Sequence, residues 1–416
     1  MNIKSYYLDL KQNFKKYIVA FLKWSLLGIA IGILCGIVGS AFEKSVSFVT
    51  DFRSANGWLI FFLPIGGLIS VATYKLLKVN NKGTNDVFKS VRSDSKLPIL
   101  LAPAVFIGSV ITHLFGGSAG REGAALQLGG SISSGLCRLF KFDNKTRHIL
   151  TLSGMGALFS ALFGTPLGAC IFALEVVSVG YICSAAFFPS IIASITAYAV
   201  SVSLGVTPEK FVIKAMPVFN AASVLKVILI AFIGSIVSIV FCFVMHSTHK
   251  LFEKYIKNDY LRIFTGGLII VFFTLIVGNK DYNGSGMETI HRIFEGETVK
   301  IYAFLIKILF TAVTIAVGFK GGEIIPTLFI GATLGSALAL LIGFNPMLGA
   351  AVGMASLFCG STNCPIATIL LFTEMFGSEG MIFFALSAVI SFFLSGYSSL
   401  YSEQKLIFSK ITEEMI

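Results

Sequence analysis

Long apolar runs, separated by short basic or glycine-rich segments, occupy most of the chain from about residue 18 onward. The first run, residues 18–48, exceeds the roughly 20 apolar residues that a helix needs to span a bilayer. We therefore expect a tilted transmembrane helix there. Comparable runs cover residues 58–77, 97–115 and 181–204, and the pattern resumes after residue 220. The pattern predicts an all-α polytopic membrane protein in contact with membrane lipid.

Shorter apolar segments flank a break at Gly164-Thr165-Pro166. The two halves, 148–162 and 166–179, are each too short to span the bilayer comfortably. Broken or re-entrant helices occur at membrane depth where they line a cavity or are buried in protein. We expect such a pair of re-entrant helices here.

Composition supports a membrane protein, because 55% of the residues are hydrophobic and only 13% are charged. Soluble domains carry roughly 25% charged residues. The net charge of +11 is interpreted as the Lys and Arg excess of cytoplasmic loops such as 78–96, with attraction of an anionic substrate as the alternative. We expect no nucleic-acid partner. The seven Cys and five His show no metal-ligand spacing, so neither a metal nor a cofactor is expected.

The second half of the chain repeats the first. The run from Gly154 to Phe159 with Pro166 and Glu175 recurs 199 residues later, and Leu126 with Gly129 recurs 202 residues later. The dipeptide Gly83-Thr84 recurs as Gly286-Met287. Such duplication, with interrupted helices at equivalent places, indicates a substrate site between the halves near mid-membrane.

The duplication divides the chain into four segments. A polar, basic N-terminal segment is expected to form a cytoplasmic amphipathic helix, and both termini are placed in the cytoplasm. Two transmembrane repeats and a short C-terminal tail follow. The predicted boundaries are 1–16, 17–205, 221–402 and 403–416.

An Arg and a Glu stand among six glycines in the stretch GGSAGREGAALQLGG, residues 116–130. An ionisable pair within a membrane-type segment is costly and marks a functional site. Glycines before a helix start allow backbone N–H groups to approach a ligand closely. We expect Glu122 to stand at the positive end of a buried helix.

Three glycine-bearing helix starts are candidates for one common site: 83–85, 120–123 and 321–326. Each helix N-terminus carries about half a positive charge, so several together can hold an anion without a full cation. The Glu122 carboxylate would compete for the anion's place and leave it on protonation. The predicted anion-binding residues are Gly83, Thr84, Asn85, Gly120, Arg121, Gly123, Gly322, Ile324 and Ile325.

Each of these residues also has a structural alternative. Arg121 and Glu122 would then form a buried ion pair, and Thr84 with Asn85 an ordinary helix cap. The remaining alternatives are packing for the two isoleucines, complementing of a helix dipole by Glu323, and structural pairing of Glu175 and Glu374.

Together these motifs resemble the CLC family of chloride channels and anion/proton antiporters. GREG at 120–123 is similar to the family's gating-glutamate motif, and GGEIIP at 321–326 is similar to its GGxFxP motif. SLYSEQ resembles the segment that carries the family's C-terminal tyrosine, which adds Tyr401 to the predicted anion ligands. The resemblance implies the CLC fold of two inverted repeats and a homodimer in which each subunit has its own pore. It also implies proton-coupled exchange through Glu122.

Departures from the family pattern indicate a subtype. The GSGIP motif is absent, and Lys82-Gly83-Thr84-Asn85-Asp86 takes its place. Val176 stands where chloride/proton antiporters carry a second glutamate. YNGSG at 282–286 is similar to the fluoride-exporting branch. We therefore expect a fluoride/proton antiporter of the bacterial inner membrane.

Several alternatives remain open at this stage. The nearest is a chloride/proton antiporter or a chloride channel of the same family. An intramembrane enzyme with Glu122 as general base lacks a nucleophile–base pair, and a cation-coupled carrier is disfavoured by the few acidic residues in the apolar runs. We expect no enzymatic activity, and no CBS-type regulatory domain in the 14-residue tail that ends at Ile416.

Overall fold

The computed structural model describes residues 3–79, 83–93, 95, 97–412 and 414, with side chains from residue 14 onward. Parts of three predicted segments lie outside the described residues: 1–2 of the N-terminal segment, 80–82, 94 and 96 of the segment 78–96, and 413 with 415–416 of the tail. Sixteen α-helices make up most of the described structure. Their bounds are α1 Ile3–Ala55, α2 Leu63–Leu76, α3 Thr84–Arg92, α4 Leu101–Leu114, α5 Glu122–Leu139, α6 Asn144–Phe163, α7 Pro166–Glu175, α8 Ser184–Ser203, α9 Ala221–Tyr255, α10 Asp259–Val277, α11 Met287–Glu295, α12 Ala303–Ala316, α13 Ile324–Leu341, α14 Pro346–Thr362, α15 Pro365–Phe376 and α16 Met381–Leu394.

Short elements complete the fold. Two 3-10 helices, η1 Gly57–Phe62 and η2 Ser378–Gly380, precede α2 and α16. A parallel pair of two-residue strands, β1 Ser178–Val179 and β2 Lys405–Leu406, attaches the C-terminal tail to the first repeat.

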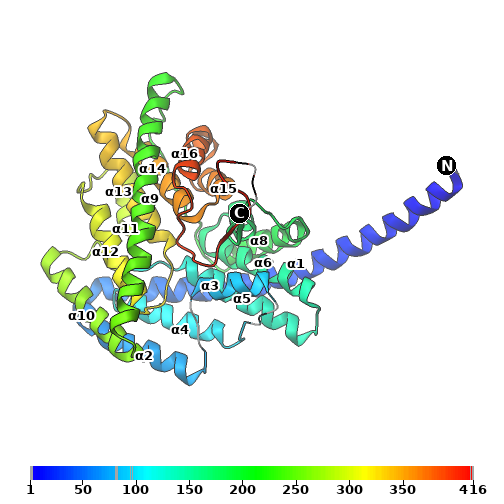
Figure 1. Cartoon of the computed structure of the whole chain (residues 1–416), viewed down its shortest axis with the longest axis horizontal. Coiled ribbons are helices and arrows are strands. Elements are labelled where there is room, and N and C mark those ends of the chain that lie inside the picture. The colour runs from blue at the N-terminus through cyan, green and yellow to red at the C-terminus, as the bar shows by residue number, and fades with distance from the viewer. Residues whose placement is uncertain (1–2, 80–82, 94, 96, 413, 415–416) are drawn as a thin grey trace.

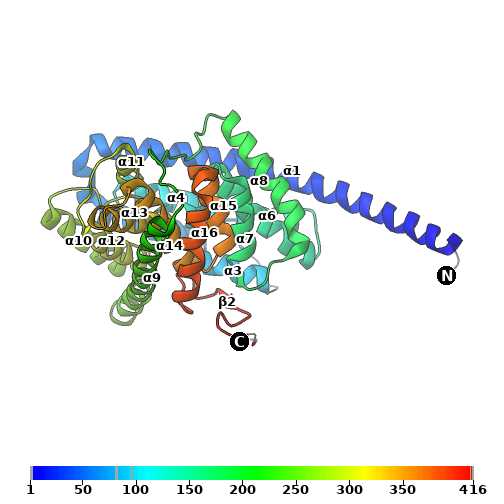
Figure 2. The ribbon, with the colours of Figure 1, turned by 90° about the horizontal axis from the view of Figure 1, so that it is seen from above.

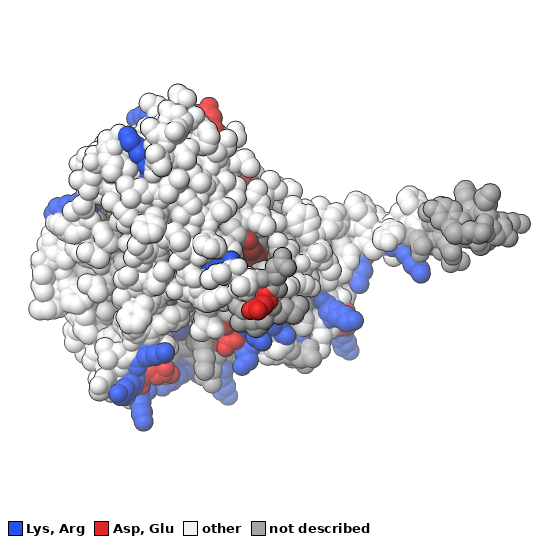
Figure 3. All heavy atoms as spheres, turned by 45° about the horizontal axis from the view of Figure 1, so that its top comes forward, with Lys and Arg blue, Asp and Glu red and all other residues white. Residues whose placement is uncertain are grey.

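Six of the described helices are long and apolar enough to cross a membrane. Five of them are α1, α8, α9, α10 and α13, and the sixth candidate joins η1 to α2. Charged side chains gather mainly along the lower rim of the body in Figure 3, and most of the surface in that view is uncharged. This distribution suits a protein whose sides face lipid.

One 53-residue helix, α1, covers both the basic N-terminal segment and the first apolar run. Its N-terminal end projects from the body in both ribbon views (Figures 1 and 2). The large apolar side chains of this projection are exposed, among them Phe14, Tyr17 and Leu26. Such a surface is stable only against lipid or another protein chain.

The segment 78–96, expected to be a cytoplasmic loop, contains helix α3. Val87 and Phe88 are buried against the body, whereas the basic residues of α3 are partly or fully exposed. This helix is amphipathic and only nine residues long, so its apolar positions are too few to produce a hydrophobic run.

The expected break between the re-entrant helices α6 and α7 is confirmed. Gly164 ends α6 with a φ of 70°, a left-handed conformation that suits glycine, and Pro166 begins α7. In the second repeat, α14 ends at Asn363 with a φ of 58°, and Pro365 begins α15. The same turn chemistry therefore interrupts the helix at both equivalent positions.

Reciprocal contacts between equivalent residues relate the two repeats by a local two-fold axis. Gly120 and Gly322 form an antiparallel bridge, with both N···O distances at 2.7 Å. Close to it, the Ser118 N–H donates to Thr314 Oγ1 at 3.1 Å, and the equivalent Lys320 N–H donates to the Thr112 hydroxyl oxygen at 3.2 Å. The duplication seen in the sequence is therefore also a spatial symmetry.

The re-entrant helices are joined by a second reciprocal contact. The Glu175 carboxylate, at the end of α7, accepts the Ile366 and Ala367 N–H groups at the start of α15, at 3.2 and 2.8 Å. Equivalently, Glu374 of α15 accepts the first two N–H groups beyond Pro166 of α7, at 3.0 and 2.8 Å. Each acid thus caps the opposite repeat's helix, as the structural alternative for these residues expected.

Candidate anion site

Two helix N-termini meet where the repeats touch. Helix α5 begins at Glu122 and α13 at Ile324, each two residues beyond the Gly120–Gly322 bridge. A Cβ atom on Gly322 would overlap the backbone of Gly123, so this approach requires glycine. The bridge therefore aims the free N–H groups of two helices at the same region.

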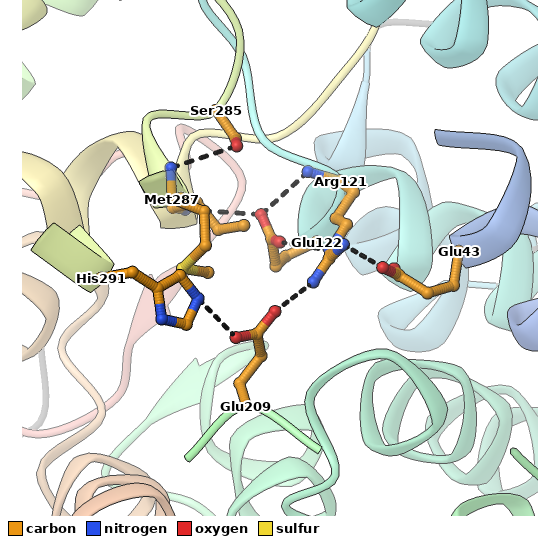
Figure 4. Close-up of polar contacts among 8 residues, drawn as sticks. Glu43, Arg121, Glu122, Glu209, Ser285, Met287 and His291 are labelled. Atoms are coloured by element: carbon orange, nitrogen blue, oxygen red, sulfur yellow. Dashed lines mark hydrogen bonds and ion pairs between the residues drawn. The ribbon is translucent and has the colours of Figure 1, made fainter. Parts of the chain in front are cut away.

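The Glu122 carboxylate occupies that region and is completely buried. Its Oε2 atom accepts the Arg121 N–H at 3.0 Å and the Ile325 N–H of the opposite repeat at 3.4 Å (Figure 4). Its Oε1 atom has no hydrogen-bond partner in the described structure. The side chain thus places a negative group where two helix N-termini converge, which is the arrangement that binds anions.

The third predicted helix start lies against the first turn of α5. Gly83 has a φ of 85°, which favours glycine, and α3 begins at the next residue. The Thr84 hydroxyl lies 3.5 Å from the Gly123 carbonyl oxygen, and the Gln127 side-chain amide donates to the same carbonyl at 3.1 Å. The structure thus brings Thr84 to the site.

The other predicted ligands have different surroundings. The Asn85 side chain accepts the Glu403 N–H of the tail at 3.2 Å. Ile325 contributes its amide to Glu122, whereas the buried Ile324 lines a small apolar void with Phe159, Phe163 and other side chains. Packing, the alternative for the isoleucines, therefore describes the Ile324 side chain.

Two further side chains, Glu323 and Tyr401, carry buried oxygen atoms without a hydrogen-bond partner in the described structure. Tyr401 is 3% exposed, its ring packs edge-on against Phe88, and its hydroxyl has no hydrogen-bond partner in the described structure. Glu323 lies beside Gly123 and also has an unpartnered Oε2. At the repeat offset of 202 residues, Glu323 is the counterpart of Arg121.

Arg121 turns its guanidinium away from the helix N-termini. It forms an ion pair with Glu43 of α1 and another, of 2.6 Å, with Glu209, whereas its Nε lies 3.7 Å from Glu122 Oε1. His291 of α11 lies 3.4 Å from the other oxygen of Glu209. Figure 4 shows this row of side chains from Glu43 to His291. Arg121 is therefore paired mainly with Glu43 and Glu209, two carboxylates that are distant in sequence, rather than with Glu122 alone.

Sequence reasoning missed Glu43, Glu209 and His291 as members of the site. Glu43 had one signal, since it is an acid near the end of an apolar run. Glu209 lies in the linker between the repeats, and its pKa is below the ordinary value. Burial alone would raise that pKa, but the hydrogen bond from His291 and the charge of Arg121 outweigh it.

A cavity of about 550 Å³ opens beside this row and is called the vestibule below. Arg121 lines it together with four other basic residues and three acids: Arg53, His113, Lys280 and His291, and Asp51, Asp281 and Glu288. Glu122 is fully buried and is not among the residues that line it. The arrangement places the Glu122 carboxylate at two helix N-termini, a position whose N–H groups also suit a small anion.

Known proteins share both the sequence pattern and the fold. Residues 66–396 match the family model described as voltage gated chloride channel. A chloride/fluoride channel protein of Pseudomonas syringae pv. tomato is 32% identical over 93% of this chain and 87% of its own length. The H(+)/Cl(-) exchange transporter ClcA of Vibrio cholerae is 26% identical over 91% and 88%.

Solved structures agree with this match. The crystal structure of a CLC-type fluoride/proton antiporter superposes with a TM-score of 0.88, at 33% identity over 92% of this chain and 98% of that one. A slow cyanobacterial Cl-/H+ antiporter gives a TM-score of 0.78 at 19% identity, which supports the fold alone. The expected fold of two repeats of transmembrane and re-entrant helices is confirmed.

Proposed function

Because this chain belongs to the voltage-gated chloride channel (CLC) family, we propose that it is a fluoride/proton antiporter that exports fluoride through Glu122. The single observation that carries the proposal is the position of the Glu122 carboxylate. It is buried between the N-termini of α5 and α13 and accepts an N–H from each repeat.

The physical basis is competition for one place. Ionised Glu122 is held by the backbone N–H groups and by the positive ends of two helices. Protonation removes its charge, and the N–H groups then become available to an anion. An anion that arrives displaces a neutral acid, and its departure allows the acid to ionise and return. Movement of the anion and of the proton is thereby coupled.

Fluoride rather than chloride is proposed on two grounds. The chain shares about a third of its residues with a protein named for chloride and fluoride and with a fluoride/proton antiporter. It also has Thr84 at the start of α3 in place of the family's serine motif. The similarity to a chloride exchanger at 26% identity makes chloride/proton exchange the second candidate.

The remaining features of the proposal concern the rest of the molecule. Glu323 and Tyr401 complete the site with their buried, unpartnered oxygen atoms. The predicted homodimer would cover part of the exposed apolar surface, with one pore in each subunit. The protein would reside in the bacterial inner membrane with both termini in the cytoplasm.

Anion efflux from liposomes that contain the purified protein tests the proposal. We expect faster fluoride than chloride efflux and proton uptake driven by a fluoride gradient. Glu122→Gln removes the ionisable group while keeping the shape, so proton uptake should be abolished. Glu253→Gln, at a carboxylate 67% exposed on α9, is the matched control. Faster chloride efflux would reject the fluoride subtype, and normal proton uptake in Glu122→Gln would reject the role of Glu122.

A further inference from the structure

Arg121 connects the lining of the vestibule with the buried Glu122. The Arg121 side chain lines the cavity, whereas the neighbouring Glu122 is fully buried and lies on the side of the helix N-termini. Arg121 therefore both lines the cavity and contacts Glu122, at 3.0 Å through its backbone N–H and at 3.7 Å through its Nε. What holds the Arg121 guanidinium in place consequently bears on transport.

Two carboxylates from separate segments hold the Arg121 guanidinium in place. Glu43 comes from α1, and Glu209 comes from the linker between the repeats. All three side chains are only 12–14% exposed, so water screens their charges weakly. A guanidinium needs one carboxylate for neutrality, yet here it has two in direct contact and Glu122 at 3.7 Å. The negative charge around Arg121 is thus larger than its single positive charge requires for neutrality.

The linker is fixed at both repeats, which gives Glu209 a defined position. The Glu209 N–H donates to the Phe163 carbonyl oxygen at the end of α6, and the Phe211 N–H donates to the Met375 carbonyl oxygen of α15, both at 3.0 Å. The Phe211 ring lies 4.9 Å from that of His291, and His291 covers the second oxygen of Glu209. The carboxylate is therefore held from both repeats.

The repeat symmetry is broken at this point. The residue equivalent to Arg121 is Glu323, so the two-fold axis places a cation on one side of the glycine bridge and an acid on the other. Only the vestibule side of the glycine bridge therefore has an arginine at this position.

We propose that Glu43 and Glu209 form an ionic latch that holds Arg121 across the passage between the vestibule and Glu122. Residue 122 becomes accessible from the vestibule when the Arg121 side chain moves away from these two carboxylates. Glu43 and Glu209 are positioning residues in this proposal, since they act through Arg121. The consequence for transport rests on the proposed function, whereas the closure itself does not.

Cysteine accessibility tests the closure without any transport. The double variant Glu122→Cys/Glu209→Gln should react with a water-soluble maleimide about tenfold faster than Glu122→Cys alone. A tenfold change corresponds to about 1.4 kcal/mol, which is close to the lower limit for a hydrogen bond to a charged group. The wild type, which has seven cysteines, supplies the background rate.

Matched variants separate the latch from a general loss of structure. Glu122→Cys/Glu209→Asp keeps the charge and should react at a rate near that of Glu122→Cys. Glu122→Cys/Glu253→Gln makes the same charge change in an exposed pair with His249 and should have no effect. Glu43→Gln provides a second, independent release of Arg121 and should also accelerate labelling. Unchanged labelling with Glu209→Gln and Glu43→Gln would overturn the proposal.

Flux measurements distinguish this proposal from the proposed function. In liposomes, Glu209→Gln should raise fluoride efflux several-fold with the ratio of protons to anions unchanged. If the wild type transports chloride instead, accelerated labelling still supports the latch, and only the fluoride assignment fails. A slower flux or an altered ratio in Glu209→Gln, at normal folding by size-exclusion chromatography, would contradict the latch.

Discussion

Glu175 and Glu374 allow a quantitative test of the contact between the repeats. In each reciprocal cap, a carboxylate accepts two N–H groups at the start of a re-entrant helix, at 2.8–3.2 Å. Glu175 is 6% exposed, whereas Glu374 is only partly buried. The sequence left structural pairing and transport open as roles for these acids, and the two roles predict different behaviour on neutralisation.

The magnitude follows from the hydrogen bonds. A hydrogen bond to a charged group contributes about 1.5–3 kcal/mol, and a neutral one contributes about 1 kcal/mol. Glu175→Gln keeps one neutral acceptor and turns an NH₂ group toward the second amide of α15. We therefore expect a loss of about 3 kcal/mol for Glu175→Gln, and about half of that for the more exposed Glu374→Gln because water replaces part of the lost interaction.

Thermal unfolding in detergent, followed by intrinsic fluorescence or by size-exclusion chromatography after heating, measures these losses. Proton uptake in liposomes is measured in parallel at a temperature where both variants remain folded. Structural pairing predicts lowered stability with an unchanged ratio of protons to anions. Unchanged stability with lost proton coupling in Glu175→Gln would refute this reasoning and assign the acid to transport.

Two further predictions concern the glycine bridge and the latch. Gly322→Ala places a Cβ atom against the Gly123 backbone and should abolish anion efflux. In the control Gly57→Ala, the new Cβ atom would meet only the flexible end of the Lys280 side chain, so efflux should stay near normal. Equal efflux in the two variants would contradict the close approach of Gly322 to Gly123. The pKa of Glu209 is lower in the folded protein than its ordinary value of about 4.3. Ionised Glu209 therefore contributes its full share to the free energy of unfolding above that ordinary value, and this contribution is lost as the pH falls through the lowered pKa. A pH series of thermal unfolding should therefore show a smaller acid-induced loss in Glu209→Gln than in the wild type, and an identical loss would contradict the ion pair.

Local signals in the sequence were sufficient for much of the architecture. Apolar run lengths predicted the long helices, because the bilayer thickness sets a minimum length that sequence shows directly. Gly164 and Pro166 predicted the break between α6 and α7, because left-handed and first-turn positions favour these residue types. The start of α3 at residues 83–85 was predicted, but the extent of this helix was not, because nine residues contain too few apolar positions to form a recognisable run.

For the candidate site, sequence by itself determined which residues are costly to bury: an acid among glycines, and two matching helix starts. Only the tertiary structure decided which groups those residues meet. Arg121 and Glu43 are 78 residues apart, and Arg121 and Glu209 are 88 apart, so no spacing rule connects them. The choice of partner depends on how the linker and α1 pack around the repeats. An ion pair across such separations is decided by the fold, because its free energy depends on distance and burial in space.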